Sequence, residues 1–260
     1  MSESKKVLID WPAEHVALVT LNRPEARNAI DGETAAALEA AIDQLEEDDT
    51  ARAVILTGSG EGVFSAGADL KEISRGNIAK LSTPRGGFAG IVNRTRTKPW
   101  IAAVNGLALA GGCEIALSCD LIIADENGAF ALPEVKRGLI AGAGGVYRLP
   151  RALPRAIALE MILTGERMSA KTLAAHGMIN ATAPADQLIP RALDLASIIS
   201  GNAPLAVRES LAIARNTLDH DEMSLQRMSD DAQERLSLTE DFKEGPLAFI
   251  EKRAPRWKGR

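Results

Sequence analysis

The sequence predicts an α/β protein that becomes mostly helical in its last third. The first observation is a strand–helix–strand pattern near the N-terminus. β-branched and other apolar residues dominate 15–22 and 52–59, which we predict to be strands. The residues between them are strong helix formers and follow Asp31, a suitable N-cap. These segments therefore predict a β–α–β unit.

Two further observations extend this pattern. The apolar segments 99–106 and 119–125 read as strands, and a Gly-Gly-Cys-Glu turn and a short helical segment lie between them. After about Leu149, five segments favour helix and one short apolar run, "MINATAP", interrupts them. The stretch 74–87 contains Gly and Pro without periodicity, and we predict that it is a mobile loop.

Composition and charge limit the classes of function. A chain of 260 residues can bury one large core, and 46% apolar with 25% charged residues is ordinary globular usage. The net charge of −5 argues against general nucleic-acid or membrane-surface binding, although a local basic patch can still meet an anionic ligand.

The two cysteines and the N-terminal segment indicate the compartment. Cys113 and Cys119 are too few for a disulfide framework and are expected to be small buried residues, with a catalytic thiol as the minor alternative. The start "MSESKKVLIDW" lacks the apolar core of a signal peptide, and no apolar run reaches the length of a membrane span. We therefore expect a cytoplasmic protein.

Two glycine-containing turns follow predicted strands. "FSAGADL" comes after 52–59, and Gly111-Gly112 comes after 99–106. Small residues at a helix start leave backbone N–H groups accessible, and two such groups can stabilise a developing oxyanion. The alternative is that these glycines only permit tight connections.

Two glutamates stand in apolar surroundings. Glu114 follows Gly111 by three residues, and Glu134 lies in "FALPEVKRG" directly after Pro133. Apolar surroundings raise the pKa of a carboxyl group, so that a coupled pair can exchange protons near neutral pH. The alternative for each is an exposed surface glutamate.

Several long segments, taken in order, resemble the crotonase, or enoyl-CoA hydratase, superfamily. They are "LNRPEARNAI", "FSAGADLKEI", "AAVNGLALAGGCEIALSCDLIIA", "FALPEVKRGLIAGAGGVYRLPR" and "EKRAPRWKGR", and they extend over nearly the whole chain. The resemblance implies a crotonase-like spiral of β–β–α units over residues 1–200. It also implies a helical C-terminal region over 201–260 that forms trimers, often stacked as hexamers.

The resemblance assigns roles to the turns and acids. It implies that the N–H groups of Ala68 and Gly111 form the oxyanion hole for an acyl-CoA thioester. It also implies that Glu114 and Glu134 hold a water and exchange a proton with the acyl α-carbon. Water would then add to a trans-2-enoyl-CoA and give a 3-hydroxyacyl-CoA, without a metal or a redox cofactor.

The resemblance also assigns residues to CoA binding, through matches to the segments that bind CoA in this family. They suggest that the backbone around Ala66 and Ala68 meets the adenine, and that Lys71, Phe249 and Lys252 meet the phosphates or ring, the last two from a neighbouring subunit. The alternative for the lysines is ordinary solvated surface residues.

Two other functions stay open at this point. "GGFAGI", "FALPEVKRG" and "RLPRALPRAIALEMILTG" resemble carnitinyl-CoA dehydratases, which also use two glutamates, whereas an isomerase usually needs one. A non-catalytic acyl-CoA binder with this fold is the other alternative. Retention of both Glu114 and Glu134 favours hydration or dehydration over isomerisation and over simple binding.

Overall fold

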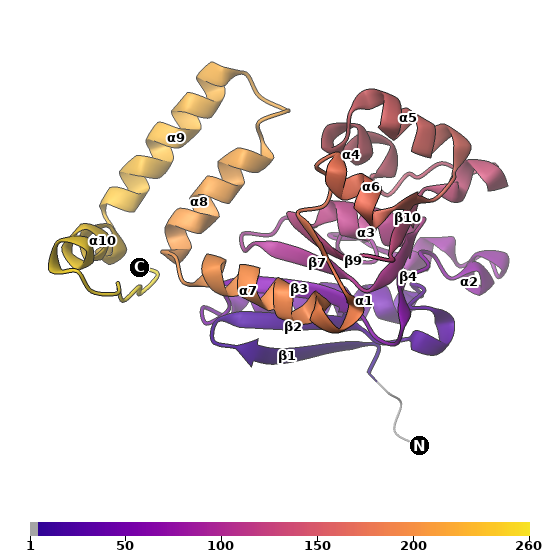
Figure 1. Ribbon diagram of the computed structural model, residues 1–260, viewed down its shortest axis with the longest axis horizontal. Helices are drawn as coiled ribbons and strands as arrows, with labels where there is room; N and C mark the ends of the chain where they lie inside the picture. The colour runs from indigo at the N-terminus through magenta and orange to yellow at the C-terminus, as the bar shows by residue number, and fades with distance from the viewer. Residues whose placement is uncertain (1–4) are drawn as a thin grey trace.

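The computed structural model describes residues 5–260. Residues 1–4 belong to the N-terminal segment in which we expect no signal peptide, and they lie outside this range. A six-stranded sheet forms the centre of the core (Figure 1). In spatial order its strands are β1 (Val7–Ala13), β2 (Val16–Leu21), β3 (Ala53–Gly58), β7 (Trp100–Val104), β9 (Leu121–Asp125) and β12 (Ala181–Ala183). β1 is antiparallel to β2, and all the other neighbours in this sheet are parallel.

A second sheet of four short strands lies beside the first. Its order is β11 (Met168–Ser169), β10 (Ala129–Ala131), β8 (Gly106–Leu109) and β4 (Gly62–Ser65). β3, β7 and β9 each lead within a few residues into a strand of this smaller sheet, and a helix or 3-10 turn follows. This repeated β–β–α order is the spiral that the family resemblance implied.

Helices cover both faces of the larger sheet because successive strand residues point to opposite sides. α1 (Gly32–Glu47) and α3 (Gly111–Ser118) share a core with Val54 and Leu56. On the other face, α7 (Leu188–Ser200) packs on Ala53 and Ile55. The predicted N-cap is confirmed, since Asp31 Oδ1 accepts a 2.8 Å hydrogen bond from the Thr34 N–H.

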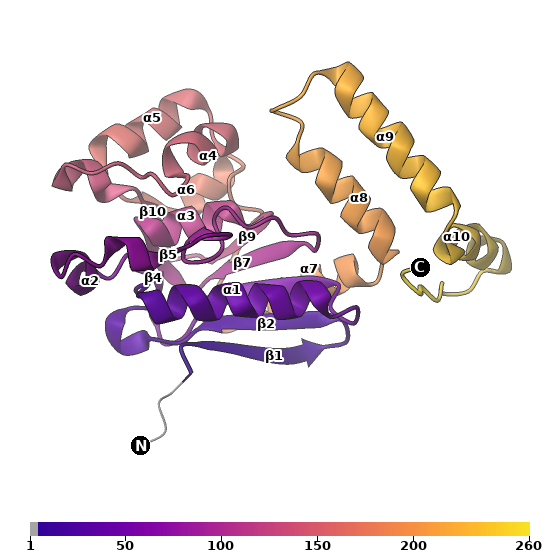
Figure 2. The same ribbon diagram turned by 180° about the vertical axis from the view of Figure 1, so that it is seen from behind.

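The last three helices form an arm beside this core, as Figures 1 and 2 show. They are α8 (Pro204–Arg215), α9 (Glu222–Ser237) and α10 (Glu240–Glu251). Arg215 at the end of α8 binds Asp120 of the core through bonds of 2.7 and 2.8 Å. Trp257 Nε1 donates to Gly201 O at 2.8 Å. This bond holds the C-terminal segment against the start of the arm.

Shorter elements connect the core. The helices are α2 (Leu70–Ser74), α4 (Gly145–Ala152), α5 (Arg155–Thr164) and α6 (Ala170–Ala175). The 3-10 turns are η1 (Pro24–Ala26), η2 (Ile78–Leu81), η3 (Pro133–Arg137) and η4 (Ala185–Gln187). "MINATAP" contains β12, so this interruption of the helical region is a sheet strand.

The α/β prediction and the crotonase fold are confirmed, but the prediction of a loop over 74–87 is wrong for its second half. This part contains η2 and the hairpin of β5 (Ser82–Thr83) and β6 (Gly87–Phe88). Side chains fasten the hairpin to α1: Thr83 Oγ1 donates to Glu39 Oε1 at 2.8 Å, and Arg85 pairs with Asp43. These long-range contacts leave no periodic signal in the local sequence.

Candidate active site

Three parallel strands end at one edge of the smaller sheet. β8 pairs with β4 at Ala108 and Ser65, and with β10 at Leu109 and Ala131. Parallel strands present their C-terminal ends on the same side, where α/β proteins commonly place their ligands. The turn 66–69, the start of α3 and η3 therefore come together there.

The two predicted oxyanion donors lie on turns that touch. A Cβ built on Gly67 would lie 2.7 Å from Gly111 N, and one built on Gly111 would lie 3.4 Å from Gly67 Cα. Within residues 5–260, neither the Ala68 N–H nor the Gly111 N–H has a protein acceptor. Two backbone donors are thus held side by side with no partner of their own, as an oxyanion hole requires.

The segment before α1 holds the Ala68 turn in place. Ile30 N donates to Gly67 O at 2.8 Å, and Asp69 N donates to Ile30 O at 2.9 Å. The buried Ser65 Oγ accepts the Gly67 N–H at 3.1 Å. The backbone groups on either side of Ala68 are therefore satisfied, and its own N–H is left for a ligand.

The second turn contains a strained residue. Ala110, directly before α3, has φ 51° and ψ −125°, a conformation that residues with a side chain rarely adopt. Its N–H donates to Ala131 O at 2.9 Å and fixes this geometry from β10. The strained residue aims the next peptide group, that of Gly111, into the site.

Glu114 is buried in the first turn of α3, with 3% of its surface exposed. Its Oε1 accepts a 2.9 Å hydrogen bond from Gly145 N, at the start of α4. Burial, and the charge of the nearby Glu134, raise its pKa to about 7, against hydrogen bonds that lower it. This carboxyl group can therefore both give and accept a proton near neutral pH.

Glu134 lies on η3, half-buried and close enough to Glu114 to raise the pKa of that group. Burial raises the pKa of Glu134 itself, while the charge of Arg137 lowers it. Glu134 Oε2 is buried and has no hydrogen-bond partner in the described chain. The structure therefore places both predicted acids together, and it leaves one oxygen free of protein partners.

The cysteines do not offer an alternative nucleophile. Cys113 is fully buried beside Glu114, and burial raises the pKa of its thiol far above the usual range. Burial also raises the pKa of Cys119, to about 12. Catalytic thiols need a lowered pKa, and these two have the opposite.

The residues predicted to contact CoA fall into two groups. Ala66 lies next to the Ala68 turn, and Lys71 is exposed on α2, whose N-cap is Asp69. Phe249 and Lys252 lie at the end of α10, at the opposite end of the molecule from α2 (Figure 1). One chain therefore does not bring all four residues together.

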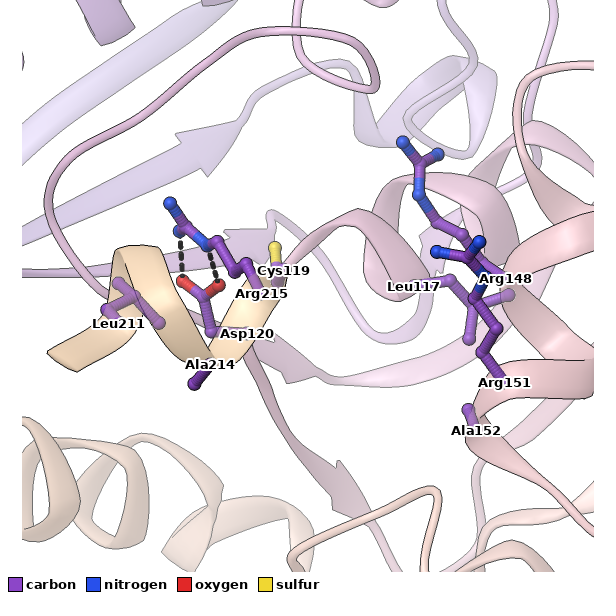
Figure 3. Close-up of a pocket in the computed structure, with 9 residues that line it drawn as sticks. All are labelled: Leu117, Cys119, Asp120, Arg148, Arg151, Ala152, Leu211, Ala214 and Arg215. Carbon is purple, nitrogen blue, oxygen red and sulfur yellow. Dashed lines mark hydrogen bonds and ion pairs between the residues drawn. The ribbon is translucent and has the colours of Figure 1, made fainter. Parts of the chain in front are cut away.

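The cavity of Figure 3 is a different feature. It measures about 400 Å³ and lies between α8 and the core, where Arg215 pairs with Asp120. Leu117, Arg148 and Leu211 are among the residues that line it, and none of the predicted site residues does. It is a groove between the arm and the core, separate from the carboxyl pair.

Sequence reasoning missed several residues that support the site. Asn28 is buried with φ 52°, and its Nδ2 donates to Ser59 O and Val63 O at 2.9 and 3.0 Å. Arg23 joins the caps of two helices through Asp31 at 3.2 Å and Asp69 at 3.1 Å. Both residues belong to "LNRPEARNAI". An Arg and an Asn on either side of a turn were the signal in the sequence that could have indicated these supporting contacts.

The fold and the site together define a crotonase-type protein: ββα repeats end in two unpaired backbone donors beside the buried Glu114 and the half-buried Glu134. The chain belongs to the enoyl-CoA hydratase/isomerase family, whose sequence model matches residues 12–260.

Similar proteins carry two different names. A carnitinyl-CoA dehydratase of Salmonella typhi is 42% identical, over 100% of both chains. The crystal structure of an enoyl-CoA hydratase from Mycobacterium tuberculosis H37Rv has a TM-score of 0.94 at 39% identity, covering 99% of this chain and 100% of its own. That of a carnitinyl-CoA hydratase from Mycobacterium avium has a TM-score of 0.79 at 46% identity, with the same coverage. Of these two crystal structures, the enoyl-CoA hydratase has the higher TM-score and the carnitinyl-CoA hydratase has the higher sequence identity.

Among the helices of residues 5–260, none has both the length and the apolar character that a membrane span requires. The same residues contain no group of three or more His, Cys, Asp or Glu arranged to hold a metal ion.

Proposed function

We propose that this protein is an enoyl-CoA hydratase, which adds water reversibly to a trans-2-enoyl-CoA. One observation carries the proposal: the free N–H groups of Ala68 and Gly111 lie on touching turns beside two carboxyl groups of raised pKa. Donors of this kind stabilise negative charge on a thioester oxygen, and the carboxyl groups supply and accept protons. Coenzyme A enters as part of the substrate.

The chemistry follows from this arrangement. The thioester oxygen accepts hydrogen bonds from Ala68 N and Gly111 N, which polarises the conjugated double bond and makes C3 electrophilic. A water held by Glu114 and Glu134 loses a proton to a carboxylate as its oxygen bonds to C3. A carboxyl group then delivers a proton to C2, and the charge on the thioester oxygen collapses to give the 3-hydroxyacyl-CoA.

The raised pKa values suit this double role. A carboxyl group with an ordinary pKa would be ionised at neutral pH and would be a poor proton donor. Glu114, with a pKa of about 7, exchanges its proton at little cost at physiological pH. The charge of Glu134 adds to the raised pKa of Glu114, so the protonation of one acid affects the other.

Carnitinyl-CoA dehydration is the second candidate, favoured by the names of relatives that are 41–42% identical over the whole chain. It uses the same two-glutamate chemistry in the direction of water loss. The substrate would then carry a quaternary ammonium on C4, whereas a simple enoyl-CoA carries none.

The test is hydration of a set of enoyl-CoA thioesters by the purified protein, followed as loss of the conjugated thioester absorbance. Crotonyl-CoA, a long-chain enoyl-CoA and 4-trimethylammonio-but-2-enoyl-CoA represent the alternatives. Hydration of the uncharged thioesters supports the proposal. Binding of all three without any turnover would contradict it and favour an acyl-CoA binder.

We also propose that the protein assembles as a trimer or as a hexamer of two trimers. The arm supports this, because it exposes large apolar side chains that a monomer would leave in water. The most exposed are Leu238 (83%), Phe249 (85%) and Ile250 (76%). A neighbouring subunit would then bring Phe249 and Lys252 to a CoA whose adenine meets the backbone around Ala66 and whose phosphates meet Lys71.

A further inference from the structure

We propose that Arg137 is a specificity-determining residue, which makes the acyl site favour a neutral or carboxylate-bearing chain over one that carries a quaternary ammonium. The inference rests on the proposed function and concerns the part of the substrate beyond C3.

The position of Arg137 follows from the geometry of η3. Side chains three residues apart lie nearly one above the other in a 3-10 turn, so Arg137 is on the same side as Glu134. Its Nη1 donates to Pro133 O at 3.4 Å, and its charge acts on Glu134. The side chain is exposed, and it forms no ion pair with any carboxylate of residues 5–260. A free positive charge therefore lies beside the acid.

The neighbouring cation behaves differently. Lys136 Nζ binds Glu166 Oε1 at 2.6 Å, so its charge is neutralised by a carboxylate that follows α5. Only Arg137 of the two basic residues in η3 leaves its charge uncompensated at the site. This difference supplies a matched control on the same turn.

The reaction places the acyl chain at this charge. Water held by Glu134 attacks C3, so C3 lies next to that carboxyl group, and C4 is bonded directly to C3. A trimethylammonium group on C4 would therefore lie within a few ångströms of η3. Like charges at such distances repel each other, most strongly where water is excluded.

The surroundings offer little to offset this repulsion. Quaternary ammonium groups are recognised by the faces of aromatic rings. Ionised carboxylates also attract them, but burial raises the pKa of both Glu114 and Glu134, which reduces the negative charge on this pair. Tyr147, the only tyrosine in the sequence, has the guanidinium of Arg148 over its ring at 5.1 Å. Arg148 also lowers the pKa of Glu114. Each of the two reacting carboxyl groups is thus already influenced by an arginine.

A second ring lies at the oxyanion turn. A Cβ built on Gly111 would lie 2.4 Å from Cε1 of Phe88, so this ring packs on the turn itself. A single ring gives a weaker site for a cation than an aromatic cage does. The free charge of Arg137 therefore favours an uncharged or anionic chain over a cationic one.

The experiment compares two thioesters of the same shape. They are 4-trimethylammonio-but-2-enoyl-CoA and its carbon isostere, 5,5-dimethylhex-2-enoyl-CoA, in which a quaternary carbon replaces the charged nitrogen. We expect the wild-type kcat/KM to be about 3- to 50-fold higher for the isostere, the range that a like charge roughly 7 Å away produces for an effective dielectric constant between about 80 and about 20. High salt should narrow the difference.

Two variants identify the source of the preference. Arg137→Gln should bring the two thioesters to within about threefold of each other, whereas Lys136→Gln should leave the preference as it is. An equal or higher rate with the ammonium thioester in wild type would overturn the proposal. An unchanged preference in Arg137→Gln would also overturn it.

Binding separates this proposal from the proposed function. Calorimetric affinities for the same two thioesters should show the same preference and the same loss of it in Arg137→Gln. Turnover of neither thioester would count against the hydratase, while the affinities would still decide the role of Arg137.

Discussion

The N–H of Gly145 donates a 2.9 Å hydrogen bond to Oε1 of Glu114. This bond joins the first residue of α4 to the first turn of α3, and it fixes the orientation of the buried carboxyl group. A glycine is needed at this position, because a Cβ would lie 2.8 Å from the Ala141 side chain and 2.9 Å from that of Leu132.

Gly145→Ala should therefore weaken both the site and the fold. The start of α4 must shift to relieve the overlap, which moves the donor of Glu114; we expect turnover to fall about 10- to 100-fold. The free energy of unfolding should decrease by about 1–3 kcal/mol, as is typical of overpacking. Gly142→Ala is the control, since its Cβ would make only an ordinary contact at 3.6 Å. Equal turnover in the two variants would argue against this role for Gly145.

The raised pKa of Glu114 predicts how stability changes with pH. Its carboxyl group titrates near 4.5 when unfolded and at about 7 in the folded protein, so folding favours the protonated form. The stability that this group contributes is complete below pH 4.5 and is lost as the pH rises to about 7.

Glu114→Gln cannot ionise and should keep this stability. Relative to wild type, its free energy of unfolding should rise by about 1–3 kcal/mol between pH 4.5 and 7.5. Urea unfolding across this range measures the difference. Parallel pH curves for the two proteins would contradict the raised pKa.

Substitutions of Ala68 test the backbone N–H and the side chain of this residue separately. Proline at this position replaces the N–H, which has no acceptor in the described chain, with a ring carbon. Ala68→Pro should lower turnover about 10²–10³-fold, the usual effect of losing one oxyanion donor. Ala68→Ser retains the N–H and should keep substantial activity. Because proline also restricts Gly67, whose φ is +85°, the melting temperature must be compared first.

The exposed apolar side chains of the arm predict association. Light scattering at micromolar concentration should give a trimer or a hexamer of the 27.6 kDa chain. Phe249→Ser, which removes a side chain that is 85% exposed in one chain, should weaken the assembly and the affinity for CoA thioesters together. A monomer in the wild type would exclude a CoA site shared between subunits.

The sequence predicted the parts of the structure that depend on local patterns. β3, β7, β9 and α1 follow from apolar periodicity and a cap at Asp31, and the turns of Ala68 and Gly111 follow from small residues after strands. The short strands β4, β8 and β10 were missed, because three or four residues carry little periodic signal. The hairpin of β5 and β6 was missed because contacts with α1 hold it.

The same distinction applies to the site. Glu114 and Glu134 were predicted together through the family resemblance, and the structure shows a physical basis for coupling between them. Asn28, Gly145 and Arg137 were not assigned roles, because each acts on a residue that only the folded chain brings near. Gly145 lies 31 positions from the carboxyl group that it binds.

The central claim is that Glu114 and Glu134 act together as the proton-exchanging pair. The most direct measurement is steady-state hydration of the best enoyl-CoA substrate by Glu114→Gln and Glu134→Gln, with thioester affinity determined by calorimetry on the same samples. We predict that each variant loses about 10²–10⁴-fold in kcat while its affinity stays near that of wild type, because the amide keeps the shape but cannot exchange the proton. Turnover near the wild-type rate in either variant would contradict the assignment.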